Sequence, residues 1–199
     1  MKMNTYALLL GLLAATPAFA DSRPVPVRGQ IETFTPGSLQ VLARNGEKIK
    51  LTVPKDLQIV SLLPRKVADI SVGDAVSTTA VSDGNGGFTA LQVSILPAAL
   101  AGQNQGQRPW DAQPDSVMTN ATISGVATAA NGGKITMKYG EKSITMTVPG
   151  DVPVIAFGPG NADLLKPGAD VFIIALRAED GSFSTNRVIA ESNGIKPPM

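Results

Sequence analysis

The stretch Leu51-Thr52-Val53-Pro54-Lys55-Asp56-Leu57-Gln58-Ile59-Val60 decides the fold, because the chain repeats it as Met146-Thr147-Val148-Pro149-Gly150-Asp151-Val152-Pro153-Val154-Ile155. The prolines of the two stretches, Pro54 and Pro149, are 95 residues apart. The same offset, within one residue, relates further positions on both sides: Gly29 and Gly125, Gly73 and Gly168, Phe88 and Phe183, Val93 and Val188. A constant offset over this length indicates two copies of one domain.

Short runs of β-branched and aliphatic residues, separated by turn formers, predict strands in both copies. The runs in the first copy are 27–34, 39–43, 48–53, 57–61, 75–81 and 88–96. Those in the second are 122–129, 134–139, 143–148, 152–156, 170–178 and 182–190. Residues 63–72 leave room for one helical turn. Six strands with one helical connection per copy predict an all-β fold of two tandem small OB-like β-barrels, with an open sandwich as the alternative.

The repeat also sets the expected domain boundaries. We expect one barrel over residues 24–101, a second over 119–193 and a tail over 194–199. Residues 102–118 are rich in Gly, Gln and Pro, which is typical of a linker. This linker contains the only Trp of the chain, in Arg108-Pro109-Trp110-Asp111.

Aromatic residues are depleted in disordered segments, so we expect the Trp motif to dock on a barrel surface. The first interpretation is a staple between the two domains. The alternative is a partner-binding patch formed by Arg108, Trp110 and Asp111.

The first 20 residues have the pattern of a secretory signal peptide. Lys2 precedes the apolar run 7–15, and Ala18-Phe19-Ala20 is a cleavage site of the A-x-A type. The run is about half of the roughly 20 residues that span a bilayer. We therefore expect export with cleavage after Ala20, which leaves 179 of the 199 residues and no membrane insertion. The absence of Cys favours the periplasm of a Gram-negative bacterium.

The missing residue types exclude most catalytic chemistry. The chain has no His and no Cys, which removes Ser-His-Asp and Cys-His catalysis, the usual zinc sites and thiol redox chemistry. No Ser is followed by Lys three positions later, so the S-x-x-K arrangement is absent. Without Lys2 the basic and acidic residues number 16 each, so we expect no strongly positive face for nucleic acid. The expectation is a non-enzymatic protein without a cofactor.

Acidic residues beside glycines give the nearest approach to a metal-binding pattern. Asp83-Gly84-Asn85-Gly86-Gly87 looks like part of a calcium loop, but the twelfth position is Ser94 instead of Glu. Further acidic residues flank turn glycines in both copies: Asp69, Asp74, Asp163 and Asp170. Asp at such positions is more typical of turns, where its side chain accepts hydrogen bonds from backbone amides. We therefore expect no metal site.

The linker motif Arg108-Pro109-Trp110-Asp111, followed by Ser116 and Met118-Thr119-Asn120-Ala121, resembles a family of exported proteobacterial proteins of unknown function. Its members often carry the label "metal ABC transporter permease". The resemblance extends over the mature chain through the duplicated Thr-Val-Pro segments, Val27-Arg28-Gly29, Leu165-Lys166-Pro167-Gly168-Ala169 and Pro197-Pro198-Met199. It implies a periplasmic all-β protein and no catalytic residues. The permease label conflicts with the sequence, since nothing after residue 20 is long and apolar enough to span a membrane.

Two functions follow as expectations. The first is a periplasmic, non-enzymatic binding or adaptor protein whose partner is a periplasmic protein or a small ligand. The second is a soluble accessory component of an envelope or transport system that binds a cation or small ligand through carboxylates.

Overall fold

The computed structural model describes residues 23–197, and these residues are mainly β-strand. The strands are β1 (Arg23–Thr35), β2 (Ser38–Ala43), β3 (Lys48–Thr52), β4 (Gln58–Arg65), β5 (Ala75–Ser82), β6 (Phe88–Ile95), β7 (Gly106–Pro109), β8 (Val117–Ala129), β9 (Gly132–Tyr139), β10 (Lys142–Pro149), β11 (Val154–Pro159), β12 (Asp170–Arg177), β13 (Phe183–Ser184) and β14 (Arg187–Ala190). Short 3₁₀ helices are η1 (Val67–Asp69), η2 (Ala98–Leu100) and η3 (Ala162–Leu164). The all-β prediction is confirmed. The predicted signal peptide lies outside the described residues.

The first barrel is closed by the pairings β1–β2, β2–β3, β3–β13, β13–β12 and β12–β1. The pair β3–β13 is parallel and the others are antiparallel. Its core joins Leu39 and Leu51 of the first copy to Val171, Ile173 and Val188 of the second. Each copy of the repeat therefore supplies part of this barrel.

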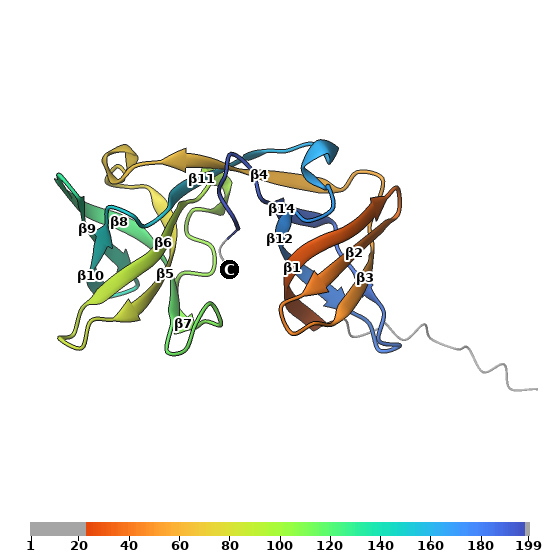
Figure 1. The fold of residues 1–199 in the computed structure, drawn as a ribbon. Coiled ribbons are helices and arrows are strands. Elements are labelled where there is room, and N and C mark those ends of the chain that lie inside the picture. The colour runs from red at the N-terminus through yellow and green to blue at the C-terminus, as the bar shows by residue number, and fades with distance from the viewer. Residues whose placement is uncertain (1–22, 198–199) are drawn as a thin grey trace, which may run out of the picture.

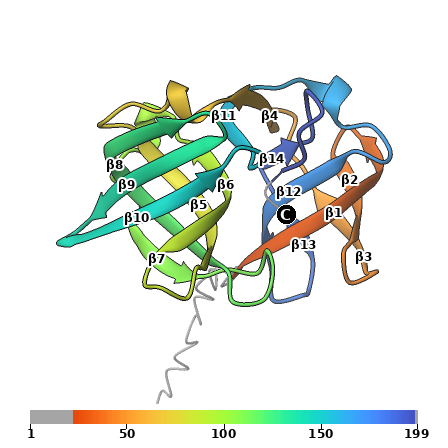
Figure 2. The same cartoon turned by 60° about the vertical axis from the view of Figure 1, so that its left-hand side comes forward.

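The second barrel is closed in the same way by β8–β9, β9–β10, β10–β6, β6–β5 and β5–β8. Here β10–β6 is the parallel pair. The core joins Val76 and Val93 of the first copy to Ile123, Ile135 and Met146 of the second. Figure 2 shows this barrel beside the first.

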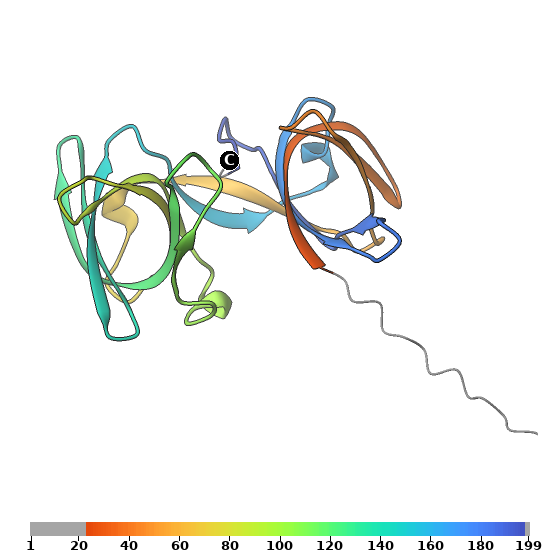
Figure 3. The same cartoon turned by 90° about the horizontal axis from the view of Figure 1, so that it is seen from below.

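The expected tandem arrangement, with one barrel in residues 24–101 and another in 119–193, is not confirmed, because the copies exchange halves. The exchange occurs at β4 and β11, which pair antiparallel and run between the two barrels (Figures 1 and 3). The start of β4 pairs with β14 of the first barrel, and the start of β11 pairs with β6 of the second. Each chain segment thus continues into the neighbouring barrel instead of folding back into its own.

Pseudo-twofold symmetry relates the two copies. Leu62 in β4 pairs with Phe157 in β11, and these two residues are separated by the repeat offset of 95. A residue that pairs with its own repeat equivalent lies at the symmetry axis. The axis therefore passes through the centre of the β4–β11 ribbon.

The first strand of each copy departs from the common offset. Ile31 and Ile123 make matching pairs of backbone hydrogen bonds to the turns before β12 and β5, and a bulge follows each of them. Ile31 is thus equivalent to Ile123, at an offset of 92. The alignment of Gly29 with Gly125 is wrong, and Gly29 corresponds to Ala121.

The expected linker, residues 102–118, connects β6 to β8, and both strands belong to the second barrel. Part of it is regular, since β7 pairs with β8 through Gly106–Pro109. The linker is therefore not the covalent connection between the barrels, which β4 and β11 provide.

Candidate binding groove between the barrels

A groove of about 530 Å³ lies between the two barrels. Side chains of β5 and β8 line it from the second barrel, and side chains of β12 and β14 line it from the first. Phe157 contributes from the ribbon on the pseudo-twofold axis, and Leu100, Arg108 and Trp110 contribute from the linker. The exchange of strands thus gives the groove walls that come from both copies.

The two walls of the groove are built from equivalent strands but differ in polarity at equivalent positions. Side chains alternate along each strand, so every second residue of β5 and β12 faces the groove while its neighbours enter a core. The facing residues are repeat equivalents: Ser77 and Phe172, Thr79 and Ile174, Ser94 and Ile189. At these three pairs of positions the second barrel carries a hydroxyl group and the first barrel carries an aromatic or aliphatic group, and we call the two sides the hydroxyl wall and the apolar wall. Leu96 and Met118 add apolar groups beside the hydroxyl wall.

The apolar wall is open to solvent. Ile174 is 47% exposed and Leu176 is 43% exposed, although the intervening Ala175 is fully buried in the barrel. β12 is therefore apolar on both faces. Such a strand is typical of a sheet that is covered on both sides, and a contiguous exposed apolar surface marks an interaction site.

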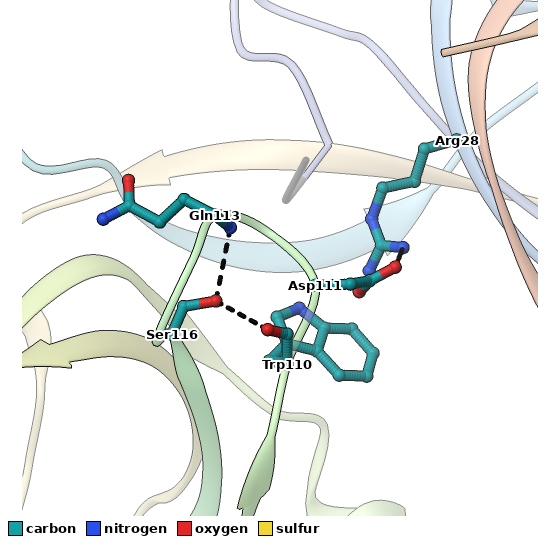
Figure 4. A network of polar contacts seen from close by, with 5 residues as sticks. All are labelled: Arg28, Trp110, Asp111, Gln113 and Ser116. Carbon is teal, nitrogen blue, oxygen red and sulfur yellow. Dashed lines mark hydrogen bonds and ion pairs between the residues drawn. The ribbon is translucent and has the colours of Figure 1, made fainter. Parts of the chain in front are cut away.

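Trp110 docks on the first barrel beside this wall. Figure 4 shows its ring next to Arg28 and Asp111. Its ring meets the ring of Phe172 edge-on, with 6.2 Å between centroids and an interplanar angle of 78°. The guanidinium carbon of Arg28 lies 4.9 Å from the Trp110 centroid and 4.6 Å from the Phe172 centroid. Ser116 holds the loop in place, because its Oγ donates to the Trp110 carbonyl at 2.8 Å and its carbonyl accepts from the Trp110 amide at 2.8 Å.

Arg28 is buried between these rings, with its side chain only 5% exposed. Nη1 donates to Asp111 Oδ2 at 2.7 Å. Burial lowers the pKa of Arg28, and the negative charge of Asp111 acts in the opposite direction. Nε and Nη2 of Arg28 and Nε1 of Trp110 are buried without a hydrogen-bond partner. Each unpaired buried donor costs about 1–3 kcal/mol, so an acceptor that reached these three groups would be stabilising.

Two of the three predicted site residues, Trp110 and Asp111, come together around Arg28. Arg108 is exposed and lies apart from that cluster, with its Nη2 3.0 Å from Met118 Sδ, but it also lines the groove. The motif thus docks on a barrel, as its aromatic residue indicates. The indole N–H has no partner, which departs from the usual behaviour of a buried Trp.

The sequence-based interpretation missed Arg28 and the apolar wall of β12. A signal for the wall exists, because the run 171–176 is apolar without alternation, as in a strand covered on both faces. Arg28 offers no such signal, since its ion-pair partner Asp111 is 83 positions away and on another barrel's loop.

The acidic residues that resemble metal ligands act in turns. Asp69, Asp74 and Asp83 accept hydrogen bonds from backbone amides of their own turns at 2.8–2.9 Å. Asp170 differs, because it is buried and pairs with Lys196 at 2.6 Å. Within residues 23–197, no group of three or more His, Cys, Asp or Glu side chains is arranged to hold a metal ion.

No helix in the described part of the chain has the length and apolar character needed to cross a membrane. No protein-family model, curated protein or solved structure matches the chain. The chemistry of the groove is therefore the guide to function.

Proposed function

We propose that the protein is an exported, non-enzymatic binding protein that holds a ligand with a large apolar part in the groove between its barrels. The observation that carries the proposal is the outward face of β12, where Phe172, Ile174 and Leu176 line the groove. The absence of His and Cys supports a binding role over a catalytic one. The alternative of binding through carboxylates finds no supporting cluster among residues 23–197.

The apolar wall supplies part of the binding free energy. Full burial of an aliphatic or aromatic side chain is worth about 1.5–3 kcal/mol, so covering half-exposed Ile174 and Leu176 contributes about 1–1.5 kcal/mol each at most. Micromolar affinity requires about 8 kcal/mol in total. The ligand must therefore also bury its own apolar surface and make polar contacts in the groove.

Binding of the uncharged dye Nile red to the mature protein tests the proposal. We expect saturable binding to one site, seen as enhanced and blue-shifted dye fluorescence, because the dye leaves water for an apolar wall. Ile174→Asn should weaken this binding about tenfold, which corresponds to 1.4 kcal/mol.

Val72→Asn is the matched control, since Val72 is 68% exposed but does not line the groove. It should leave dye binding unchanged. Equal binding by the wild type and Ile174→Asn, or no binding by the wild type, would contradict a ligand site in the groove.

Export is tested by intact-mass analysis of the protein from fractionated cells. Because Ala18-Phe19-Ala20 matches a cleavage site, we expect a periplasmic protein that begins at Asp21. Ala18→Glu should leave the precursor uncleaved, since the site requires a small residue. Recovery of the full-length wild-type chain in the inner membrane would contradict the proposal of export.

A further inference from the structure

All the charged side chains that line the groove are positive. Its lining includes two arginines, Arg108 and Arg187, and no Asp or Glu. They come from opposite barrels, since Arg108 is in β7 and Arg187 begins β14. Neither has an acidic partner among the described residues. An apolar cavity with unpaired positive charge favours a ligand that carries a negative charge.

Hydrogen-bond donors in the lining also lack acceptors. Nε of Arg187 and Nε1 of Trp110 are shielded from water and have no hydrogen-bond partner among residues 23–197. The lining holds one unpaired buried acceptor, Oδ1 of Asn120, so donors exceed acceptors. A carboxylate accepts several hydrogen bonds and donates none, which complements this surplus.

Arg187 is placed to hold a charged headgroup while the apolar wall holds a chain. Arg187 and Ile189 are two residues apart in β14 and both line the groove. Residues at this spacing lie on one face of a strand, about 7 Å apart. Ile189 continues into the surface formed by Phe172 and Ile174 on the neighbouring strand β12, which pairs with β14. A cationic position therefore adjoins a continuous apolar surface.

Building on the proposed function, we infer that the ligand is a single-chain amphiphile with a carboxylate headgroup. The headgroup pairs with Arg187, and the alkyl chain lies along the wall of Phe172, Ile174 and Ile189. Arg108, on the opposite side, adds positive potential without holding the headgroup. The hydroxyl wall of Ser77 and Thr79 lines the groove on the side of the second barrel, across from the apolar wall. The volume of about 530 Å³ lies within the range of small-ligand sites.

Competition against Nile red tests the inference with three probes of twelve-carbon chain length, which suit a pocket of small-ligand size. They are dodecanoate, dodecanol and dodecyltrimethylammonium, each used below its micelle concentration at pH 8, where the carboxylate is ionised. We expect dodecanoate to compete at least about tenfold better than dodecanol, with the ammonium compound weakest. Arg187→Met keeps an unbranched apolar stem and removes the charge, so it should make dodecanoate and dodecanol equal.

Arg177→Met is the control, because Arg177 is an exposed arginine of β12 that does not line the groove. It should retain the preference for dodecanoate, and thermal melting should show that both variants are folded. Equal competition by dodecanoate and dodecanol in the wild type, or a preference for the ammonium compound, overturns the inference while leaving an apolar site intact. A preference that survives Arg187→Met but is lost in Arg108→Met overturns the assignment of the headgroup to Arg187. Absence of Nile red binding instead marks failure of the proposed function itself.

Discussion

At the scale of single residues, Gly29 and Gly125 differ in whether their surroundings have room for a side chain. A Cβ on Gly29 would collide with the carbonyl oxygen of Leu42 in the neighbouring strand. A Cβ on Gly125 would meet the side chain of Thr136 at 3.6 Å, an ordinary contact. Close approach of two backbones, rather than a special dihedral angle, therefore requires glycine at Gly29.

We expect Gly29→Ala to lower the free energy of unfolding by about 1–3 kcal/mol or more, because β1 and β2 must separate to admit the methyl group. Gly125→Ala should change it by about 0.5 kcal/mol at most. Urea denaturation of the two variants measures both values. Similar losses at the two positions would contradict the close approach of β1 and β2 at Gly29.

At the scale of elements, the equivalent edges of β1 and β8 are protected in different ways in the two barrels. Ile31 makes its backbone hydrogen bonds with the turn before β12. Because successive residues of a strand present their backbone groups to alternate sides, Pro24 and Pro26 present theirs to the opposite edge of β1. The equivalent edge of β8 is covered by β7, whereas no described strand covers this part of β1. Proline has no N–H to offer there, so the open edge is protected against pairing with another strand.

The linker is the element that joins the second barrel to the surface of the first, through Trp110. We expect Trp110→Ala to cost about 1–3 kcal/mol of stability, the range for a large apolar side chain leaving its contacts. The emission of this only Trp should be blue-shifted in the isolated wild-type protein. Trp110→Phe keeps a ring against Arg28 and should lose less. Solvent-exposed emission together with an unchanged melting temperature in Trp110→Ala would show that the motif does not dock within the molecule.

At the scale of the whole molecule, the sequence predicts the strands and the closed barrels but not which halves form them. A barrel contains equivalent residue pairs whether its C-terminal strands come from the same copy or from the other copy, because the two copies are alike. Only the path of β4 and β11 distinguishes the arrangements. The strands predicted over residues 57–61 and 152–156 overlap β4 and β11, which extend further toward the C-terminus. Nothing in their composition specifies that they pair with each other. The sequence does not predict the groove for the same reason, because its two walls come together only after the copies exchange halves.

The exchange of halves is testable with cysteine pairs, since the chain has no native Cys to interfere. Thr79 in β5 lies opposite Met118 in β8 in the observed arrangement. In a tandem arrangement β5 would instead lie beside β1, where Pro26 is the structural equivalent of Met118 at the offset of 92. Ile123 makes its backbone hydrogen bonds on the side of β8 that faces β5. Backbone groups alternate between the two sides of a strand, so Met118, five residues earlier, makes no backbone hydrogen bond to β5 and its pair with Thr79 is a non-hydrogen-bonded one. Such pairs have Cα atoms about 4.5 Å apart, within the range that a disulfide spans.

We therefore expect Thr79→Cys with Met118→Cys to form an intramolecular disulfide under mild oxidation, seen as a mass loss of two hydrogens and a linked pair of tryptic peptides. Thr79→Cys with Pro26→Cys should remain reduced, because these two positions lie in different barrels. The second pair is a fair control, since Pro26 is exposed and its replacement disturbs no core. The opposite outcome, with only the Pro26 pair linked, would mean that each copy closes its own barrel. The hydroxyl and apolar walls would then no longer be held face to face by the β4–β11 ribbon, and the binding groove would lose its structural basis.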